Sequence, residues 1–294
     1  MTLGATAKII LAMLLWAACF PLITAGLEFS PHLTFATFRA TLAGLSLVLL
    51  ATMLRRPLPR GGRIWATLAV VGFGATTMGF LGMFHAAEFV TPGLATVIAN
   101  TQPLMAAMLA GLVLKEQLPT VGWIGLGAGF AGILVIALPK FMVGGDYAIG
   151  IAYIIMAACG VTLSNVAIKA LAGKVDVLFA MGLQLLIGAV PLALASIALE
   201  DPTTIQWTPT FAMSLLSLAV LGSALVYWLW FSALESVPLN RANVFSFLVP
   251  VFGLTIGFLL YDERLSGLQL SGIGLVILGI ALVNLNREAA GHGQ

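Results

Sequence analysis

The sequence predicts an all-α integral membrane protein, with ten transmembrane helices forming two inverted five-helix repeats around a central cavity. Three observations predict this fold class. The chain of 294 residues is 61% hydrophobic and only 8% charged, whereas a soluble domain carries about 25% charged residues. Its apolar runs reach about 20 residues, the length that crosses a bilayer as a helix. Its second half repeats landmarks of the first half at a shift of 147 residues.

The internal repeat is clearest when residues 81–140 are aligned with residues 228–287, where 15 of 60 positions are identical. Several matched residues are of types that shape or end membrane helices: Glu88 with Glu235, Pro103 with Pro250, Glu116 with Glu263, Gly125 with Gly272 and Gly132 with Gly279. The repeat predicts two domains of equal length, residues 1–147 and 148–294. Internal repeats of this kind are typical of carriers that work by alternating access.

Short polar or charged breaks divide the chain into ten apolar segments. The predicted helices cover, in order, residues 7–26, 33–54, 64–86, 93–114, 119–138, 148–171, 177–199, 210–234, 239–260 and 266–285. The first resembles a signal peptide, with Lys8 before an apolar run. A retained helix is favoured because the run is long enough to span and the second half has a comparable segment at 150–171.

The number of helices per repeat sets their relative orientation. Five is odd, so the second repeat must enter the membrane from the opposite face, and such inverted pairs enclose a site near the bilayer midplane. Lys and Arg gather on cytoplasmic loops. With the N-terminus inside, ten of the 13 lie on the cytoplasmic side, two lie outside and Arg39 lies within a span. We therefore expect both termini to be cytoplasmic, in a cell inner (plasma) membrane.

Two prolines in equivalent helices are the candidate hinges. Pro103 and Pro250 lie midway along the fourth and ninth predicted helices, where proline removes a backbone donor and kinks the helix. The polar residues Asn100, Gln102 and Ser246 lie within four residues of them, and we interpret these as substrate-binding groups of a midplane cavity. The alternative is that the prolines are passive and the polar groups bond neighbouring helices.

Further candidate substrate-binding residues are polar or aromatic side chains far from the helix ends. Trp16 lies in the middle of the first helix, and Asn165 belongs to an unusually polar stretch of the sixth. Tyr227 and Trp230 lie one turn apart on the eighth helix, close enough to share a face. These aromatic residues are candidate walls of a substrate pocket; an interfacial aromatic belt is the alternative.

Charged and amide groups inside the membrane complete the candidate site. Arg39 lies about seven residues into the second helix, and a charge at that depth is costly and by default functional. It is a candidate partner for a substrate carboxylate, or it holds a helix end or extends towards the surface. Gln184 lies at a comparable depth in the seventh helix. His85, near the end of the third helix, is the candidate proton-coupling residue.

The sequence also speaks against several classes of protein. All eleven acidic residues fall at helix ends or in loops, so no carboxylate is available near the midplane for proton or sodium coupling. No nucleotide-binding P-loop, metal-ligand spacing or cluster of catalytic groups is present. We therefore predict no enzymatic activity, no cofactor and no metal. The basic cluster at residues 55–63 is a topology signal rather than a nucleic-acid site. The glycine-rich fifth and tenth helices predict close helix packing, and a monomer or weak homodimer.

The chain resembles the drug/metabolite transporter superfamily, in particular its ten-helix EamA-type carriers. The resemblance rests on each mid-helix proline followed by an acidic motif, Pro103 with Lys115–Leu118 and Pro250 with Asp262–Leu265, and on the glycine-rich helices after them. Trp16 and Arg39 also match, and the resemblance covers the whole chain. It implies a basket of ten helices around a cavity that moves small metabolites, often exporting amino acids; the branch suspected is that of YddG-like amino-acid exporters.

The expected function is therefore export of amino acids or related small metabolites by alternating access, through facilitated diffusion or exchange. One alternative is a drug or metabolite exporter with proton coupling, although the superfamily's multidrug members use a first-helix glutamate where this chain has Trp16. Another is a carrier of phosphorylated or nucleotide-linked metabolites, which requires several cavity cations where only Arg39 is available. A lipid-modifying enzyme and a channel are less consistent with the repeat and with the absence of a catalytic cluster. The expected partners are the substrate and the lipid bilayer.

Overall fold

The computed structural model describes residues 3–102, 105, 120–141, 146–169, 171, 174–234, 245, 248–262 and 264–290. All regular structure within these residues is helical. Six of the described segments are each long and apolar enough to cross a membrane: Gly4–Leu27, His32–Met53, Gly62–Phe89, Asp146–Ser164, Val177–Leu199 and Pro209–Trp230. Helices suit this environment because they satisfy their own backbone hydrogen bonds where water is absent.

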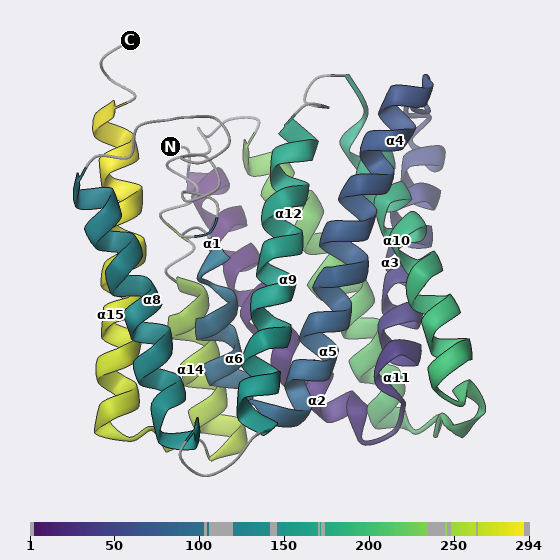
Figure 1. The fold of residues 1–294 in the computed structure, drawn as a ribbon. Helices are drawn as coiled ribbons and strands as arrows, with labels where there is room; N and C mark the ends of the chain where they lie inside the picture. Colours follow the sequence, from purple (N-terminus) through teal and green to yellow (C-terminus); the bar gives the residue numbers. More distant parts are fainter. Residues whose placement is uncertain are drawn as a thin grey trace.

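The described helices lie at all ten expected positions (Figure 1). Those of the first repeat are α1 (Leu3–Ala17) with α2 (Cys19–Leu27), α3 (His32–Met53), α4 (Gly62–Val71) with η1 (Gly72–Met78) and α5 (Gly79–Phe89), α6 (Pro92–Ala99), and α8 (Thr120–Phe141). Those of the second repeat are α9 (Asp146–Lys169), α10 (Val177–Leu199), α11 (Pro209–Leu216) with η3 (Ser217–Leu225) and α12 (Val226–Leu234), α14 (Leu248–Tyr261), and α15 (Gly267–Ala290). A 3₁₀ turn, η2 (Pro202–Thr204), lies between α10 and α11.

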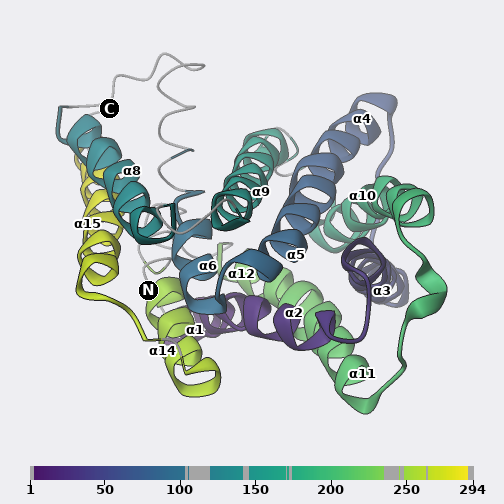
Figure 2. The ribbon, with the colours of Figure 1, turned by 60° about the horizontal axis from the view of Figure 1, so that its bottom comes forward.

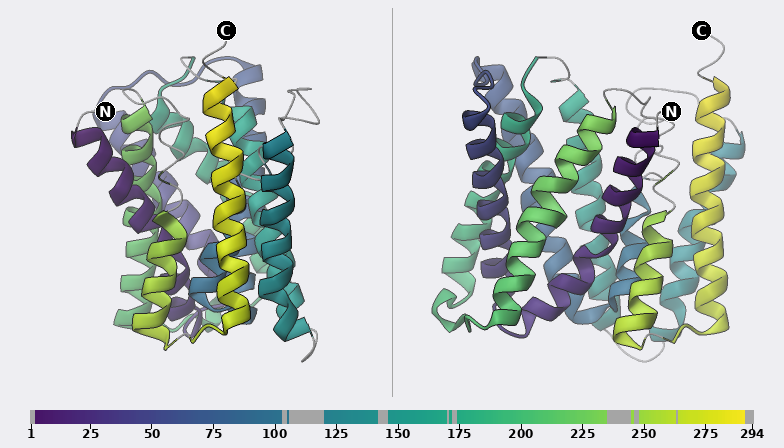
Figure 3. Two further views of the ribbon diagram at one scale, coloured as in Figure 1. Left: turned by 90° about the vertical axis from the view of Figure 1, so that its left-hand side faces the viewer. Right: turned by 180° about the vertical axis from the view of Figure 1, so that it is seen from behind.

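The repeats have opposite orientations in the bundle. The beginning of α1 and the end of α15 lie on the same face, which we call the termini face (Figure 3). The first helix of the second repeat, α9, begins instead on the opposite face (Figure 1). The protein is thus an all-α membrane protein built as two inverted five-helix repeats. Relative to the sequence prediction, the third helix runs three residues further, to Phe89, because Glu88 stays within its last turn.

Helix pairing follows the internal symmetry. Equivalent helices of the two repeats pack on each other: α3 on α10, α6 on α14, and α8 on α15. Two other contacts join helices that are not equivalent in the two repeats: α5 packs on α9, and α1 packs on α12. Viewed from the opposite face, the α8–α15 pair and the α3–α10 pair stand at the two ends of the bundle (Figure 2). Every one of these pairs joins the two repeats, so most helix packing is between the halves.

Glycines allow the closest of these approaches. A Cβ on Gly132 would lie 2.5 Å from the Gly272 carbonyl oxygen, and a Cβ on Gly279 would lie 2.5 Å from that of Gly125. The glycine pattern of the fifth and tenth helices therefore serves packing within the chain, as small residues do in membrane bundles. Gly127 has nothing within 4 Å of the position of its absent Cβ. Only part of the glycine pattern therefore lies in the α8–α15 contact.

A π-helical segment interrupts the same helix in each repeat. Shifted by 147 residues, η1 (Gly72–Met78) falls on residues 219–225, inside η3 (Ser217–Leu225). The first packs against α9 and α10, and the second packs against α2 and α3. Both segments therefore contact the other repeat at equivalent positions. π-Helical turns are rare and occur often at functional sites.

Candidate functional site

Arg39 lies inside the bundle and is almost fully buried. Its side chain is 3% exposed, although it stands only eight residues into α3. Nε donates a hydrogen bond to Ser223 Oγ at 3.2 Å, and Nη2 contacts the Gly222 carbonyl oxygen at 3.4 Å and Cys19 Sγ at 3.5 Å. Among the residues that the structure describes, Nη1 is buried without a hydrogen-bond partner. The side chain therefore does not extend to the surface, and its charge is held between α2, α3 and η3.

No carboxylate compensates this charge within the described part of the chain. The guanidinium instead lies over the Phe80 ring at 4.2 Å and 5.9 Å from the centre of the Phe84 ring. Cation–π contacts of this kind contribute about 2 kcal/mol when they are desolvated. A buried charge without an opposite charge is costly. Arg39 is therefore suited to accept an anionic group from outside the chain.

The predicted aromatic residues Trp16, Tyr227 and Trp230 lie close to one another and to Arg39. The Trp16 and Trp230 ring centres lie 5.5 Å apart, joining α1 to α12. Tyr227 packs on the same buried cluster as Trp16 and lies near enough to Arg39 and Cys19 to interact with them electrostatically. The structure thus brings together four of the predicted substrate-binding residues, Trp16, Arg39, Tyr227 and Trp230.

Gln184 makes the contact in the second repeat that corresponds to the contact between Arg39 and Ser223. It is 1% exposed, and its Oε1 accepts a hydrogen bond of 2.8 Å from the Thr76 hydroxyl. Thr76 in η1 is equivalent to Ser223 in η3 at the shift of 147 residues. In both repeats, a polar side chain from the second helix thus meets a hydroxyl on the other repeat's π-helical segment. The two contacts differ in charge, because only Arg39 is cationic.

The fourth helix is interrupted before Pro103. The described helix α6 ends at Ala99, four residues before the proline, and Asn100 is its C-cap with φ −76° and ψ 10°. Proline clashes with the carbonyl four residues earlier, so the position of this break matches its effect. Asn100 and Gln102 are half-buried beside the break. Pro103 itself lies outside the described residues.

The other predicted residues on the second repeat are only partly placed. Pro250 is buried in the first described turns of α14. Asn165 lies on α9, and its side chain lies outside what the structure describes, as does the whole of Ser246. The hinge role of the two prolines stays a prediction.

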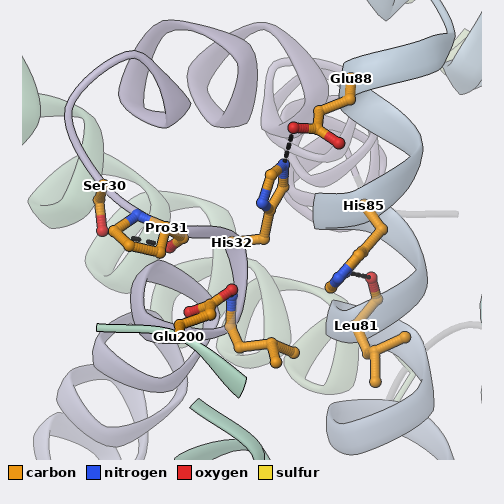
Figure 4. Close-up of polar contacts among 8 residues, drawn as sticks. Ser30, Pro31, His32, Leu81, His85, Glu88 and Glu200 are labelled. Atoms are coloured by element: carbon orange, nitrogen blue, oxygen red, sulfur yellow. Dashed lines mark hydrogen bonds and ion pairs between the residues drawn. The ribbon is translucent and has the colours of Figure 1, made fainter. Parts of the chain in front are cut away.

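His85 belongs to a cluster on the opposite face, shown in Figure 4. Its ring stacks on that of His32 with centres 5.0 Å apart, and it lies 5.1 Å from the Tyr153 ring on α9. Its Nδ1 contacts the Leu81 carbonyl oxygen at 3.0 Å. The acid of the cluster, Glu88, contacts His32 rather than His85. The distance between His32 Nε2 and Glu88 Oε1 is 2.9 Å, an ion-pair contact whose geometry is not that of an aligned hydrogen bond.

Glu200 is a residue whose role the sequence did not indicate. Its carboxylate accepts hydrogen bonds from the backbone N–H groups of Leu33 and Thr34, at 2.8 and 2.9 Å, and from the Thr34 hydroxyl at 2.8 Å. A helix begins with unpaired N–H groups, and α3 has no side-chain cap of its own. Glu200, 167 residues away along the chain from Leu33, supplies that cap from the end of α10.

Two hollows on the surface lie away from these residues. One, of about 510 Å³, is lined by residues 57–60, Ile64 and residues 174–176 on the termini face. The other, of about 440 Å³, is almost entirely apolar and lies between α3 and α11, next to Trp207. Within the described residues no group of three or more His, Cys, Asp or Glu side chains could hold a metal ion.

Comparison with protein families decides the broad assignment. The model of the EamA-like transporter family matches the chain twice, over residues 5–138 and 148–285. The chain belongs to this family. The two matches correspond to the two halves of the repeat, and they make the protein a multi-pass membrane transporter. The exact bounds of the halves, 1–147 and 148–294, stay a prediction.

Relatives along nearly the full length agree with this assignment. An uncharacterized transporter of Bacillus subtilis, YvbV, is 30% identical over 94% of this chain and 90% of its own length. A probable amino-acid metabolite efflux pump of Escherichia coli is 27% identical over 92% of this chain and 91% of its own. A solved structure titled "Crystal structure of protein" superposes with a TM-score of 0.69 at 19% identity, covering 99% of both chains. This last similarity shows the fold alone.

Proposed function

We propose that this EamA-family transporter exports amino acids or related small metabolites across the inner membrane. It works by alternating access, and its termini face is cytoplasmic. The observation that carries the substrate class is the buried Arg39 guanidinium, with Nη1 unpartnered. A substrate carboxylate would supply the missing negative charge through charge-assisted hydrogen bonds. The nearby Trp16, Tyr227 and Trp230 would contact the apolar part of the substrate, in a cavity between the repeats.

The mechanism follows from the inverted repeats. Each repeat contributes a π-helical segment that contacts the second helix of the other repeat, through Ser223 with Arg39 and through Thr76 with Gln184. We infer that rearrangement at these segments, with bending at Pro103 and Pro250, exposes the site to one face at a time. Since all acidic residues lie at helix ends or in loops, the carrier operates by facilitated diffusion or exchange, as a monomer or weak homodimer.

Counterflow in proteoliposomes tests this proposal. We would load vesicles with unlabelled L-phenylalanine, L-leucine or L-threonine and follow uptake of the labelled compound at equal pH on both sides. Uptake should occur without a pH gradient, and phenethylamine, which lacks the carboxylate, should not compete.

The matched variants are Arg39→Gln and Arg39→Lys. Losing a charge-assisted bidentate contact costs about 1.5–3 kcal/mol, so Arg39→Gln should raise the half-saturating concentration at least tenfold. Arg39→Lys should recover part of the loss. Competition by phenethylamine as strong as by L-phenylalanine would overturn the carboxylate assignment. A strict need for a pH gradient would overturn facilitated transport and favour the proton-coupled alternative.

A further inference from the structure

Several hydrogen bonds on the opposite face join segments that are far apart in the sequence. Glu200 joins the end of α10 to the start of α3. The Tyr261 hydroxyl donates a 2.6 Å hydrogen bond to the Pro21 carbonyl oxygen, joining α14 to α2. Gln206 N–H donates to the Phe29 carbonyl oxygen at 2.9 Å. An alternating-access carrier must break contacts of this kind to open that face.

One contact on this face differs from the others because a proton can make or break it. His32 begins α3, Glu88 lies in the last turn of α5, and their side chains meet at 2.9 Å. The two side chains are 20% and 48% exposed, although the His32 Nε2 atom itself is buried. A neutral imidazole can donate at most one hydrogen bond to the carboxylate, whereas an imidazolium also forms an ion pair with it.

We propose that His32 and Glu88 form a proton-binding latch that holds the gate on the opposite face closed. This inference rests on the proposed function, since it needs a carrier that opens to both faces. The latch joins the second helix to the third, and Glu200 already fixes the second helix to the seventh. Forming the ion pair therefore adds a link between α5 and the joined α3 and α10, beside the packing of α5 on α2 and α3, and losing it removes that link.

The charged and titratable groups around His32 allow the latch to bind one proton rather than two. The titratable or charged groups that face His32 are Glu88 and His85 from α5 and Glu200 from the end of α10. Burial, the largest influence, disfavours the imidazolium form of His32, and the two carboxylates favour it. His85 stacks on it at 5.0 Å, so a second imidazolium there would be repelled by the first. Tyr153 lies beyond His85, against its ring.

The sign of the pH effect follows from which form of His32 pairs with Glu88. The ion pair requires the imidazolium form, and lowering the pH populates that form. Raising the pH through the histidine range removes it. Partly exposed ion pairs contribute about 0–1 kcal/mol, which corresponds to at most a fivefold change in the ratio of open to closed gate. The proton regulates opening here and does not drive transport.

Spin-label distances test the latch without any substrate. Labels would be attached at Thr91→Cys, after α5, and Thr204→Cys, after α10, both exposed on the opposite face. The exposed Cys159 would be replaced by Ser, and the buried Cys19 kept. In lipid nanodiscs, the ratio of long to short distances should rise two- to fivefold from pH 5.5 to pH 7.5.

Charge-removing variants decide whether the contact is responsible. Glu88→Gln and His32→Gln should each show the pH 7.5 distribution at both pH values, and the double variant should match either one. Glu28→Gln, an exposed acid on the same face, should respond to pH as the wild type does. A wild-type distribution that ignores pH, or a pH response retained in Glu88→Gln, would overturn the latch. If Glu88→Gln does not fold, His32→Gln gives the same readout.

A transport arm separates this inference from the substrate proposal. L-Phenylalanine counterflow at equal pH on both sides should be two- to fivefold slower at pH 5.5 than at pH 7.5 in the wild type, and equal at both pH values in Glu88→Gln. If none of the tested amino acids is carried but the label distances respond to pH, the latch stands and the proposed substrate class fails. Counterflow that is fast at both pH values in the wild type contradicts the latch alone.

Discussion

Glu200 should stabilise the junction between α10 and α3, which belong to different repeats. Its carboxylate accepts three hydrogen bonds, two of them from N–H groups in the first turn of α3. Replacement by Gln leaves one acceptor oxygen, removes one of the N–H bonds and removes the negative charge that the helix N-terminus favours. We expect Glu200→Gln to lower the free energy of unfolding by about 1–2 kcal/mol, and Glu200→Ala by about 2–4 kcal/mol.

Reversible unfolding in mixed detergent micelles, followed by circular dichroism, would measure these differences. Asp201→Asn is the matched control, because Asp201 is exposed and its side chain bonds only its near neighbour Thr203. Those hydrogen bonds lower the pKa of the Asp201 carboxyl, but they join no other helix. We expect a change below about 0.5 kcal/mol there, as for most surface substitutions. Glu200→Ala within about 0.5 kcal/mol of the wild type would refute the capping role.

Three further outcomes are expected. Gly160→Ala should destabilise the protein by about 1–3 kcal/mol, because its Cβ would lie 2.5 Å from the Gly74 carbonyl oxygen in η1; Gly127→Ala, which meets nothing within 4 Å, should be neutral, and equal unfolding energies for the two would contradict this packing. Pro103→Ala and Pro250→Ala should each slow counterflow much more than they weaken substrate binding, since the change straightens a hinge; wild-type rates in both would show that the prolines are passive. Reporter fusions at Gly144 and Gln294 should report opposite sides of the membrane, with Gln294 cytoplasmic, and the same side for both would contradict the inverted arrangement.

Some features of the candidate site could be predicted from the sequence and others could not. Arg39 stood out because a charge within an apolar run is rare, and Trp16, Tyr227 and Trp230 stood out because aromatic residues far from helix ends are unusual. That these residues lie close together could not be predicted from the sequence, because it depends on how α1 and α12 pack. His85 was chosen because histidine is a residue type that carries protons, but nothing local reveals that His32 stacks on it and contacts Glu88. The role of Glu200 was hidden for the same reason, because its partners are more than 160 residues away.

The membrane environment, the ten helices and their inverted repetition could all be predicted from the sequence. Local composition and the repeat pattern indicate these properties. In a bilayer, an apolar run of about 20 residues has few alternatives to a helix. Which polar groups meet depends on how the helices pack in three dimensions. The tertiary structure revealed the paired π-helical segments, because their hydrogen-bond register responds to packing by the other repeat rather than to local propensity. It also brought Arg39 to Ser223 and Glu200 to α3, since contacts between inverted repeats join residues far apart along the chain.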